Sequence, residues 1–120
     1  MKEDRPWGNY EVLLDSDDCK VKRITVHPGG KLSYQYHHHR AEVWTIISGK
    51  GILTLEGDRS DVNPGQVIKI EVCQKHRIEN TGSNVSEDLV FIEVQTGSYF
   101  GEDDIIRIED VYGRSSSPKI

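Results

Sequence analysis

Turn-forming residues interrupt this chain at short, regular intervals, and that spacing limits the possible fold more than any other feature. Short apolar or alternating runs recur every eight to twelve residues, separated by glycine, proline, asparagine or aspartate. Such spacing is typical of a β-sandwich or β-barrel. Nine strands are predicted, over Tyr10–Leu14, Cys19–Val26, Leu32–His38, Val43–Ser48, Gly51–Leu55, Arg59–Val62, Val67–Val72, His76–Asn80 and Leu89–Thr96. The sequence does not decide whether residues 101–112 form a last strand or a short helix.

Length and charge exclude several classes of protein. The 120 residues favour one domain, which we place at 1–114 and expect to be followed by a flexible tail at 115–120. The net charge is −5 and no basic run is present, so nucleic-acid binding is not expected. No stretch approaches the roughly 18 apolar residues of a membrane span, and the charged N-terminus lacks the apolar core of a signal peptide. Cys19 and Cys73 are therefore expected to be free thiols in a cytoplasmic protein.

Residue types that bind metals are concentrated in one short stretch. Three consecutive histidines, at 37–39, lie between Gln35 and Glu42, and His76 follows later in the chain. Burying these groups between apolar strands costs free energy unless a partner binds them, and a divalent metal would bind them all. Side chains alternate along a strand, so Gln35, His37 and His39 should share one face. If that face and the face of His76 both point into a barrel, the ligands converge with Glu42.

The spacing of these residues resembles the two motifs of the cupin family. The places of Gly, His, His, Glu and Gly in the first motif are occupied by Gly29, Gln35, His37, Glu42 and Gly49. The places of Gly, Pro, Gly, His and Asn in the second motif are occupied by Gly65, Glu71, Cys73, His76 and Asn80. The resemblance implies an all-β, single-domain cupin, which is a small double-stranded β-helix or jelly-roll barrel.

Short sequence segments in and around these motifs resemble, more narrowly, the type II mannose-6-phosphate isomerases, which are often the C-terminal cupin domain of a mannose-1-phosphate guanylyltransferase. These segments include Arg5-Pro6-Trp7-Gly8-Asn9-Tyr10, His37-His38-His39-Arg40-Ala41-Glu42-Val43-Trp44 and Ile92-Glu93-Val94-Gln95-Thr96-Gly97-Ser98-Tyr99. The chain has no glycine-rich phosphate loop, so guanylyl transfer is not expected from it alone. The resemblance implies a metal-dependent isomerase that interconverts mannose 6-phosphate and fructose 6-phosphate through an enediol.

The resemblance also implies roles for individual residues. One divalent metal ion is assigned to Gln35, His37, Glu42 and His76, with Zn²⁺ favoured and Mn²⁺, Ni²⁺, Co²⁺ or Fe²⁺ allowed. The metal would polarise the sugar carbonyl, and a positioned base would move the proton between neighbouring carbons. His39 is expected to be a reserve ligand or the general acid–base. Candidates for binding the substrate phosphate are Arg40, Lys31 and, if the C-terminal segment folds back over the cavity mouth, Arg107.

Two other functions fit parts of the pattern. A cupin dioxygenase would need a redox metal and often uses three histidines with a glutamate, so Gln35 argues against it. A non-catalytic sugar- or metabolite-binding cupin is permitted by the departures from the family pattern at Val43, Glu71 and Cys73. The acidic pair at 103–104 is interpreted as a solvated or capping face. By analogy with other small cupins, the chain is expected to form a homodimer.

Overall fold

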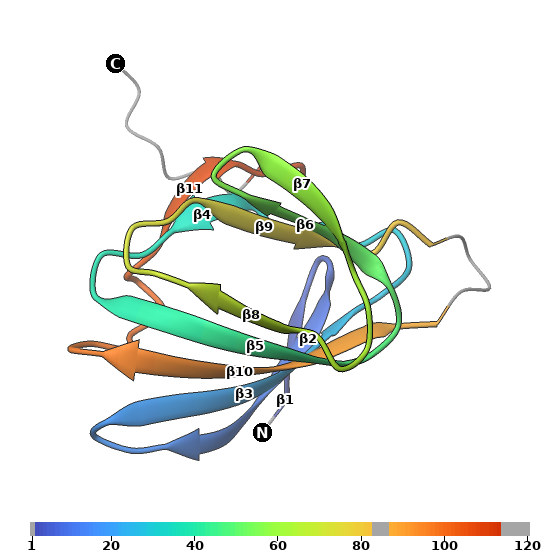
Figure 1. Ribbon diagram of the computed structural model, residues 1–120. Coiled ribbons are helices and arrows are strands. Elements are labelled where there is room, and N and C mark those ends of the chain that lie inside the picture. The colour runs from blue at the N-terminus through green and yellow to red at the C-terminus, as the bar shows by residue number, and fades with distance from the viewer. Residues whose placement is uncertain (1, 83–86, 114–120) are drawn as a thin grey trace.

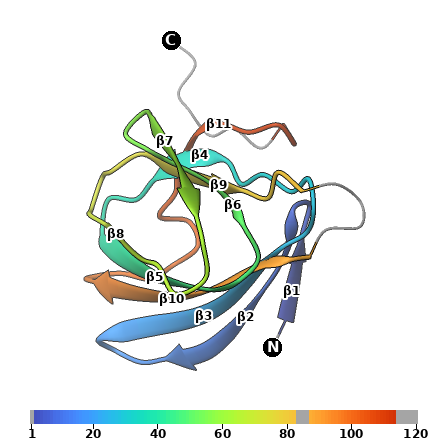
Figure 2. The ribbon, with the colours of Figure 1, turned by 45° about the vertical axis from the view of Figure 1, so that its right-hand side comes forward.

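The computed structural model describes residues 2–82 and 87–113, and these residues form two antiparallel sheets that face each other (Figures 1 and 2). The large sheet contains, in spatial order, β1 (Lys2–Arg5), β2 (Gly8–Asp15), β3 (Cys19–Val26), β10 (Leu89–Gly97), β5 (Arg40–Ser48) and β8 (Val67–Ile70). The small sheet contains β11 (Ile106–Glu109), β4 (Tyr34–Tyr36), β9 (His76–Glu79), β6 (Gly51–Leu55) and β7 (Asp58–Val62). The predicted all-β barrel is confirmed.

The structure adds detail that the turn spacing did not provide. It places β1 before the first predicted strand. Within residues 101–112, which the sequence left undecided between strand and helix, it shows the strand β11, which pairs with β4. The strand predicted over Leu32–His38 is shorter than expected, because β4 ends at Tyr36. The described residues contain no helix, and therefore none that could cross a membrane. The boundary at 114 remains a prediction, and the predicted tail at 115–120 lies outside the described residues.

The interior of the barrel changes from apolar to polar along the same strands. In β10 the inward side chains run from Leu89 and Phe91 to Glu93 and Gln95, and all four are buried. The antiparallel partner β5 makes the same change in the opposite sequence direction, because Gln95 lies opposite Glu42 and Phe91 lies opposite Ile46. One end of the barrel is therefore a hydrophobic core, and the other end buries polar groups that need partners.

A strained residue holds the loop beside the polar end. Cys73 has a backbone φ of 66°, in the left-handed region that L-residues avoid, and it stands where the second cupin motif has glycine. Its N–H donates a 2.8 Å hydrogen bond to the carbonyl of His37. The family motif has glycine at this position because the backbone here is left-handed, which glycine adopts without strain. Cys73 adopts the same conformation at an energetic cost.

We expect Cys73→Gly to stabilise the protein. Relief of the left-handed strain contributes roughly 1–2 kcal/mol, and the greater freedom of glycine in the unfolded chain offsets about 0.4–1 kcal/mol of it. The net gain in the free energy of unfolding should be about 0.5–1 kcal/mol, measured by urea denaturation. Gly65→Ala is the reverse control, because Gly65 has a φ of 89° and a Cβ added there would meet no atom outside its chain neighbours within 4 Å. Equal stability of Cys73→Gly and the parent chain would show that Cys73 carries no strain.

Candidate metal centre

Three side chains meet at the polar end of the barrel. His37 follows β4, Glu42 lies on β5 and His76 begins β9, so both sheets contribute to the cluster. Their ligand atoms all lie within 4.8 Å of one another, and each residue is at most 2% exposed. The pairing of Gln35 with His76 between β4 and β9 fixes this approach. The convergence expected from strand alternation is therefore present for these three residues.

Both histidines are fixed in the tautomer that a metal ligand needs. The Nδ1–H of His37 donates to the carbonyl of Asp104 at 2.5 Å, and that of His76 donates to the carbonyl of Gln74 at 2.8 Å. A carbonyl can only accept, so each Nδ1 carries the hydrogen and each Nε2 keeps its lone pair. These Nε2 atoms lie 3.3 and 3.9 Å from the carboxylate of Glu42. The Nε2 of His76 is buried without a hydrogen bond to any described residue.

The charges at the cluster also suit a divalent cation. Burial lowers the pKa of His37 to about 4, and burial likewise lowers the pKa of His76, so both rings are neutral at pH 7. Burial alone would raise the pKa of Glu42, but the interactions with His76, Arg40 and His37 outweigh it and hold that pKa well below its usual range. Two neutral imidazoles and one carboxylate form a donor set that Zn²⁺ and similar ions bind.

Gln35 lies next to the three ligands, with its amide nitrogen towards them. Its Oε1 accepts a 2.6 Å hydrogen bond from the hydroxyl of Ser33, and its Nε2 is 3.5 Å from the Nε2 of His37. The oxygen and nitrogen of an amide exchange places by a half-turn about the last side-chain bond, and the Ser33 hydroxyl can then accept from the amide. Gln35 is thus placed to become a fourth ligand through its oxygen.

Arg40 contacts two of the three ligands directly. Its Nε donates to Glu42 at 2.8 Å, and an Nη atom lies 3.2 Å from the Nε2 of His37. Arg40 is only 6% exposed and opens β5. Phosphate binding by Arg40 stays a prediction, and the structure places this residue both against the ligand cluster and on the wall of the adjacent cavity.

The structure does not bring His39 or Lys31 to this cluster. His39 was expected to share the face of His37, but β4 ends at Tyr36 and the alternation stops there. The side chain of His39 is 56% exposed and pairs with Asp104 at 3.2 Å. Lys31 forms an isolated bridge with Glu79 and is not among the residues that line the cavity. His39 and Lys31 therefore lie outside the buried cluster, and the roles given to them stay predictions.

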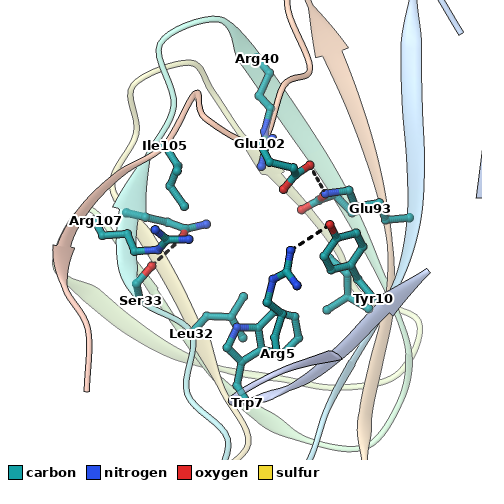
Figure 3. Close-up of a pocket in the computed structure, with 13 residues that line it drawn as sticks. Arg5, Trp7, Tyr10, Leu32, Ser33, Arg40, Glu93, Glu102, Ile105 and Arg107 are labelled. Carbon is teal, nitrogen blue, oxygen red and sulfur yellow. Dashed lines mark hydrogen bonds and ion pairs between the residues drawn. The ribbon is translucent and has the colours of Figure 1, made fainter. Parts of the chain in front are cut away.

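A cavity lined by both sheets opens beside the ligands (Figure 3). Arg5 and Arg107 extend into it from different walls, and Arg107 belongs to β11, as expected for a C-terminal segment that folds back. Its wall also contains Lys22, Glu93 and Glu102. The cavity is thus rich in cationic side chains.

Glu93 is a residue of this site that the sequence reading missed. Burial, followed by the charge of Glu42, raises the pKa of Glu93 to about 8, so its carboxyl is largely protonated at pH 7. Its oxygens accept from Trp44 at 3.2 Å and from Gln95 at 2.7 Å. The sequence contains one indication of it: Glu93 follows Phe91 by two residues and therefore shares its inward face in β10. A charged side chain is rarely buried unless it has a partner.

Comparison with curated proteins finds similarity to one part of larger enzymes of mannose metabolism. It is 45% identical over 116 residues to the alginate biosynthesis protein AlgA of Pseudomonas aeruginosa. It is 47% identical over 110 residues to a mannose-1-phosphate guanylyltransferase of Escherichia coli. These matches cover 97% and 92% of this chain but only 24% and 23% of the relatives. The chain spans about a quarter of the length of the curated relatives it matches.

These relatives correct the functional prediction. The prediction of a metal-dependent isomerase that interconverts mannose 6-phosphate and fructose 6-phosphate is wrong, because the relatives are guanylyltransferases and polysaccharide biosynthesis proteins, and this chain corresponds to one domain of them. What holds is the coarser statement that the relatives are enzymes of mannose metabolism.

Solved structures and a family model agree on the fold and the lineage. A conserved protein with a double-stranded β-helix domain from Klebsiella pneumoniae superimposes with a TM-score of 0.70 at 25% identity, covering 82% of each chain. The cupin architecture implied by the two motifs is thereby confirmed. Residues 1–110 match the family described as mannose-6-phosphate isomerase C-terminal. With nearly the whole chain covered by that family model, this protein belongs to the mannose-6-phosphate isomerase C-terminal family of cupin domains.

Proposed function

We propose that this chain is a metal-binding domain in which His37, Glu42 and His76 hold one divalent cation, with Gln35 as the fourth ligand. The observation that carries the proposal is the buried Nε2 of His76, which has a lone pair, faces a carboxylate and makes no hydrogen bond to a described residue. Such an atom is costly to bury unless something binds it. Zn²⁺ is the favoured ion, because nitrogen and carboxylate ligands in a four-coordinate set suit it.

We further propose that the cavity binds a phosphorylated sugar. The support is the group of cationic side chains on its wall, Arg5, Lys22, Arg40 and Arg107, together with the mannose-phosphate enzymes among the relatives. A guanidinium can bind a phosphate with two parallel hydrogen bonds. Lys31 is not included, since it lies outside the cavity wall.

The reaction class that suits this centre is proton transfer next to a sugar carbonyl, as in aldose–ketose isomerases of sugar phosphates. A bound divalent ion supplies Lewis-acid stabilisation of the oxyanion that forms. The chain supplies a cavity with charged side chains that would orient the phosphate. No particular pair of sugars is assigned.

The homodimer and the cytoplasmic location also stay proposals. The outer face of the large sheet carries an apolar row that runs across four strands, formed by Leu14, Val21, Val94 and Val43, and it could be covered by a second copy. Both cysteines are free thiols in the structure, which supports a reducing compartment.

We expect chelator-treated protein to bind one equivalent of Zn²⁺, measured by isothermal titration calorimetry. The loaded protein should then bind mannose 6-phosphate, used as a probe, at least tenfold more tightly than mannose. Deuterium incorporation beside the carbonyl in D₂O reports the reaction class. Failure to bind Zn²⁺ would overturn the metal proposal. Zinc binding without discrimination between the sugar and its phosphate would overturn the cavity assignment alone.

A further inference from the structure

The C-terminal segment, defined here as residues 98–109, connects the two sheets past the metal centre. In Figure 1 it runs from the end of β10, in the large sheet, up to β11, which lies beside β4 in the small sheet. It starts with a hydrogen bond of 3.0 Å from the N–H of Ser98 to the carbonyl of His39. Ile105 and Arg107 of this segment line the cavity. The segment is therefore part of the wall around the site.

Asp104 of this segment binds all three consecutive histidines. Its carbonyl accepts the Nδ1–H of His37. Its carboxylate accepts the backbone N–H groups of His38 and His39 at 3.0 and 2.9 Å, and it pairs with the ring of His39 at 3.2 Å. Asp104 is only 7% exposed, and these donors hold the pKa of its carboxyl below the usual range even though burial opposes the shift. An acidic residue expected to be solvated is thus tied to the ligand loop.

Ion pairs on both sides hold the segment in place. Towards the large sheet, Glu102 accepts a 2.6 Å hydrogen bond from Lys22, which is nearly buried. Towards the small sheet, Arg77 donates to the carboxylate of Glu109 at 2.6 Å and to its carbonyl at 3.0 Å. The position of Asp104 is consequently set by contacts with both halves of the barrel.

The two histidine ligands differ in how they are held. His76 lies within β9 and donates to Gln74, two residues away, so its orientation is local. His37 lies beyond the end of β4, so no strand ladder fixes it, and its ring is oriented by Asp104, 67 residues later in the chain. Only one of the two depends on a distant segment.

We propose that Asp104 is a positioning residue of the metal centre, which fixes the tautomer and the ring orientation of His37 through its carbonyl and holds the histidine loop through its carboxylate. This inference rests on the proposed metal site. It makes the C-terminal segment a condition for tight metal binding, although the segment supplies no ligand. Loss of such an outer partner of a histidine ligand lowers metal affinity by roughly 10–100-fold.

The test compares Asp104→Ala and Asp104→Asn with Asp103→Ala. Asp103 is adjacent, and its carboxylate is bonded to Tyr99 rather than to the histidines. Asp104→Ala keeps the carbonyl but removes the carboxylate that holds it against the histidine loop, so the carbonyl is displaced from His37 and Zn²⁺ binding should weaken roughly 10–100-fold in titration calorimetry. Asp104→Asn, which keeps one oxygen acceptor, should lie between it and the parent chain, and Asp103→Ala should stay within about twofold.

A second readout separates positioning from a general loss of structure. Imidazole ¹H–¹⁵N spectra of the metal-free protein report which ring nitrogen carries the hydrogen. In Asp104→Ala the signals of His37 should shift towards a mixture of tautomers, while those of His76 stay unchanged. Parental affinity and an unchanged His37 tautomer in both Asp104 variants would overturn the inference and leave the metal proposal standing. Absence of Zn²⁺ binding in the parent chain would instead refute the metal proposal, and the tautomer comparison would still test Asp104.

Discussion

Replacing His76 with alanine is expected to lower the affinity for Zn²⁺ by at least roughly 100-fold. The expectation follows from geometry, since the substitution removes a nitrogen that faces Glu42 with its lone pair uncommitted. Loss of an outer partner alone costs about 10–100-fold in affinity, and loss of a ligand should exceed that. Titration calorimetry on chelator-treated protein measures the effect, and the zinc-dependent rise in the unfolding temperature should disappear with it.

His27→Ala is the matched control for this experiment. His27 is another histidine of the same chain, but its side chain is 55% exposed and pairs with Asp88 at 3.1 Å. We expect His27→Ala to bind Zn²⁺ with the parental affinity. If both variants lost affinity equally, histidine content rather than the buried cluster would determine binding. If neither did, His76 would be a structural residue.

Replacing Arg40 with methionine is expected to destabilise the metal-free protein by about 3 kcal/mol. The guanidinium donates to the fully buried Glu42, and removing one partner of a buried ion pair typically costs about 3–5 kcal/mol because the other charge is left uncompensated. The lower end applies, since the indole N–H of Trp44 continues to donate to Glu42 at 2.9 Å. Urea denaturation in the presence of a chelator measures the loss.

Zinc should restore much of that stability. A divalent cation bound to Glu42 replaces the missing guanidinium charge, and the hydrogen bond from Arg40 to the Nε2 of His37 no longer competes for the lone pair. With saturating Zn²⁺, the stability gap between Arg40→Met and the parent should fall by at least half. Arg59→Met is the control, because Arg59 is 58% exposed and its pair with Glu79 contributes at most about 1 kcal/mol. An unchanged gap would mean that Arg40 and the cation do not share the site.

Local periodicity explains which parts of the fold could be predicted. Strand alternation and turn residues located the inner strands well, because these signals lie within a few residues of one another. The same alternation predicted that His37, Glu42 and His76 converge, since His37 directly follows β4. It failed at His39, because alternation holds only along a strand and His39 lies further beyond Tyr36, where β4 ends.

The missed residues depend on contacts between distant parts of the chain. Asp104 was interpreted as a solvated acid, and nothing near it in sequence indicates that it binds a histidine loop 65 residues earlier. Glu93 lies in an apolar strand, and its pKa is raised by burial and then by the charge of Glu42, which is distant in sequence. The role of Arg40 depends on which group its guanidinium contacts. The sequence alone does not determine whether that group is a substrate phosphate or Glu42.

The acceptors that orient both histidine rings belong to the main chain, at Gln74 and Asp104. A side-chain substitution cannot delete a peptide carbonyl; it can only displace it. Evolutionary drift at the residues flanking these carbonyls should therefore be tolerated more readily than a change in the number of residues. Insertions or deletions between β8 and β9, or between β10 and β11, would shift an acceptor out of reach. Loop length, together with the carboxylate of Asp104, therefore sets the ligand geometry in this barrel.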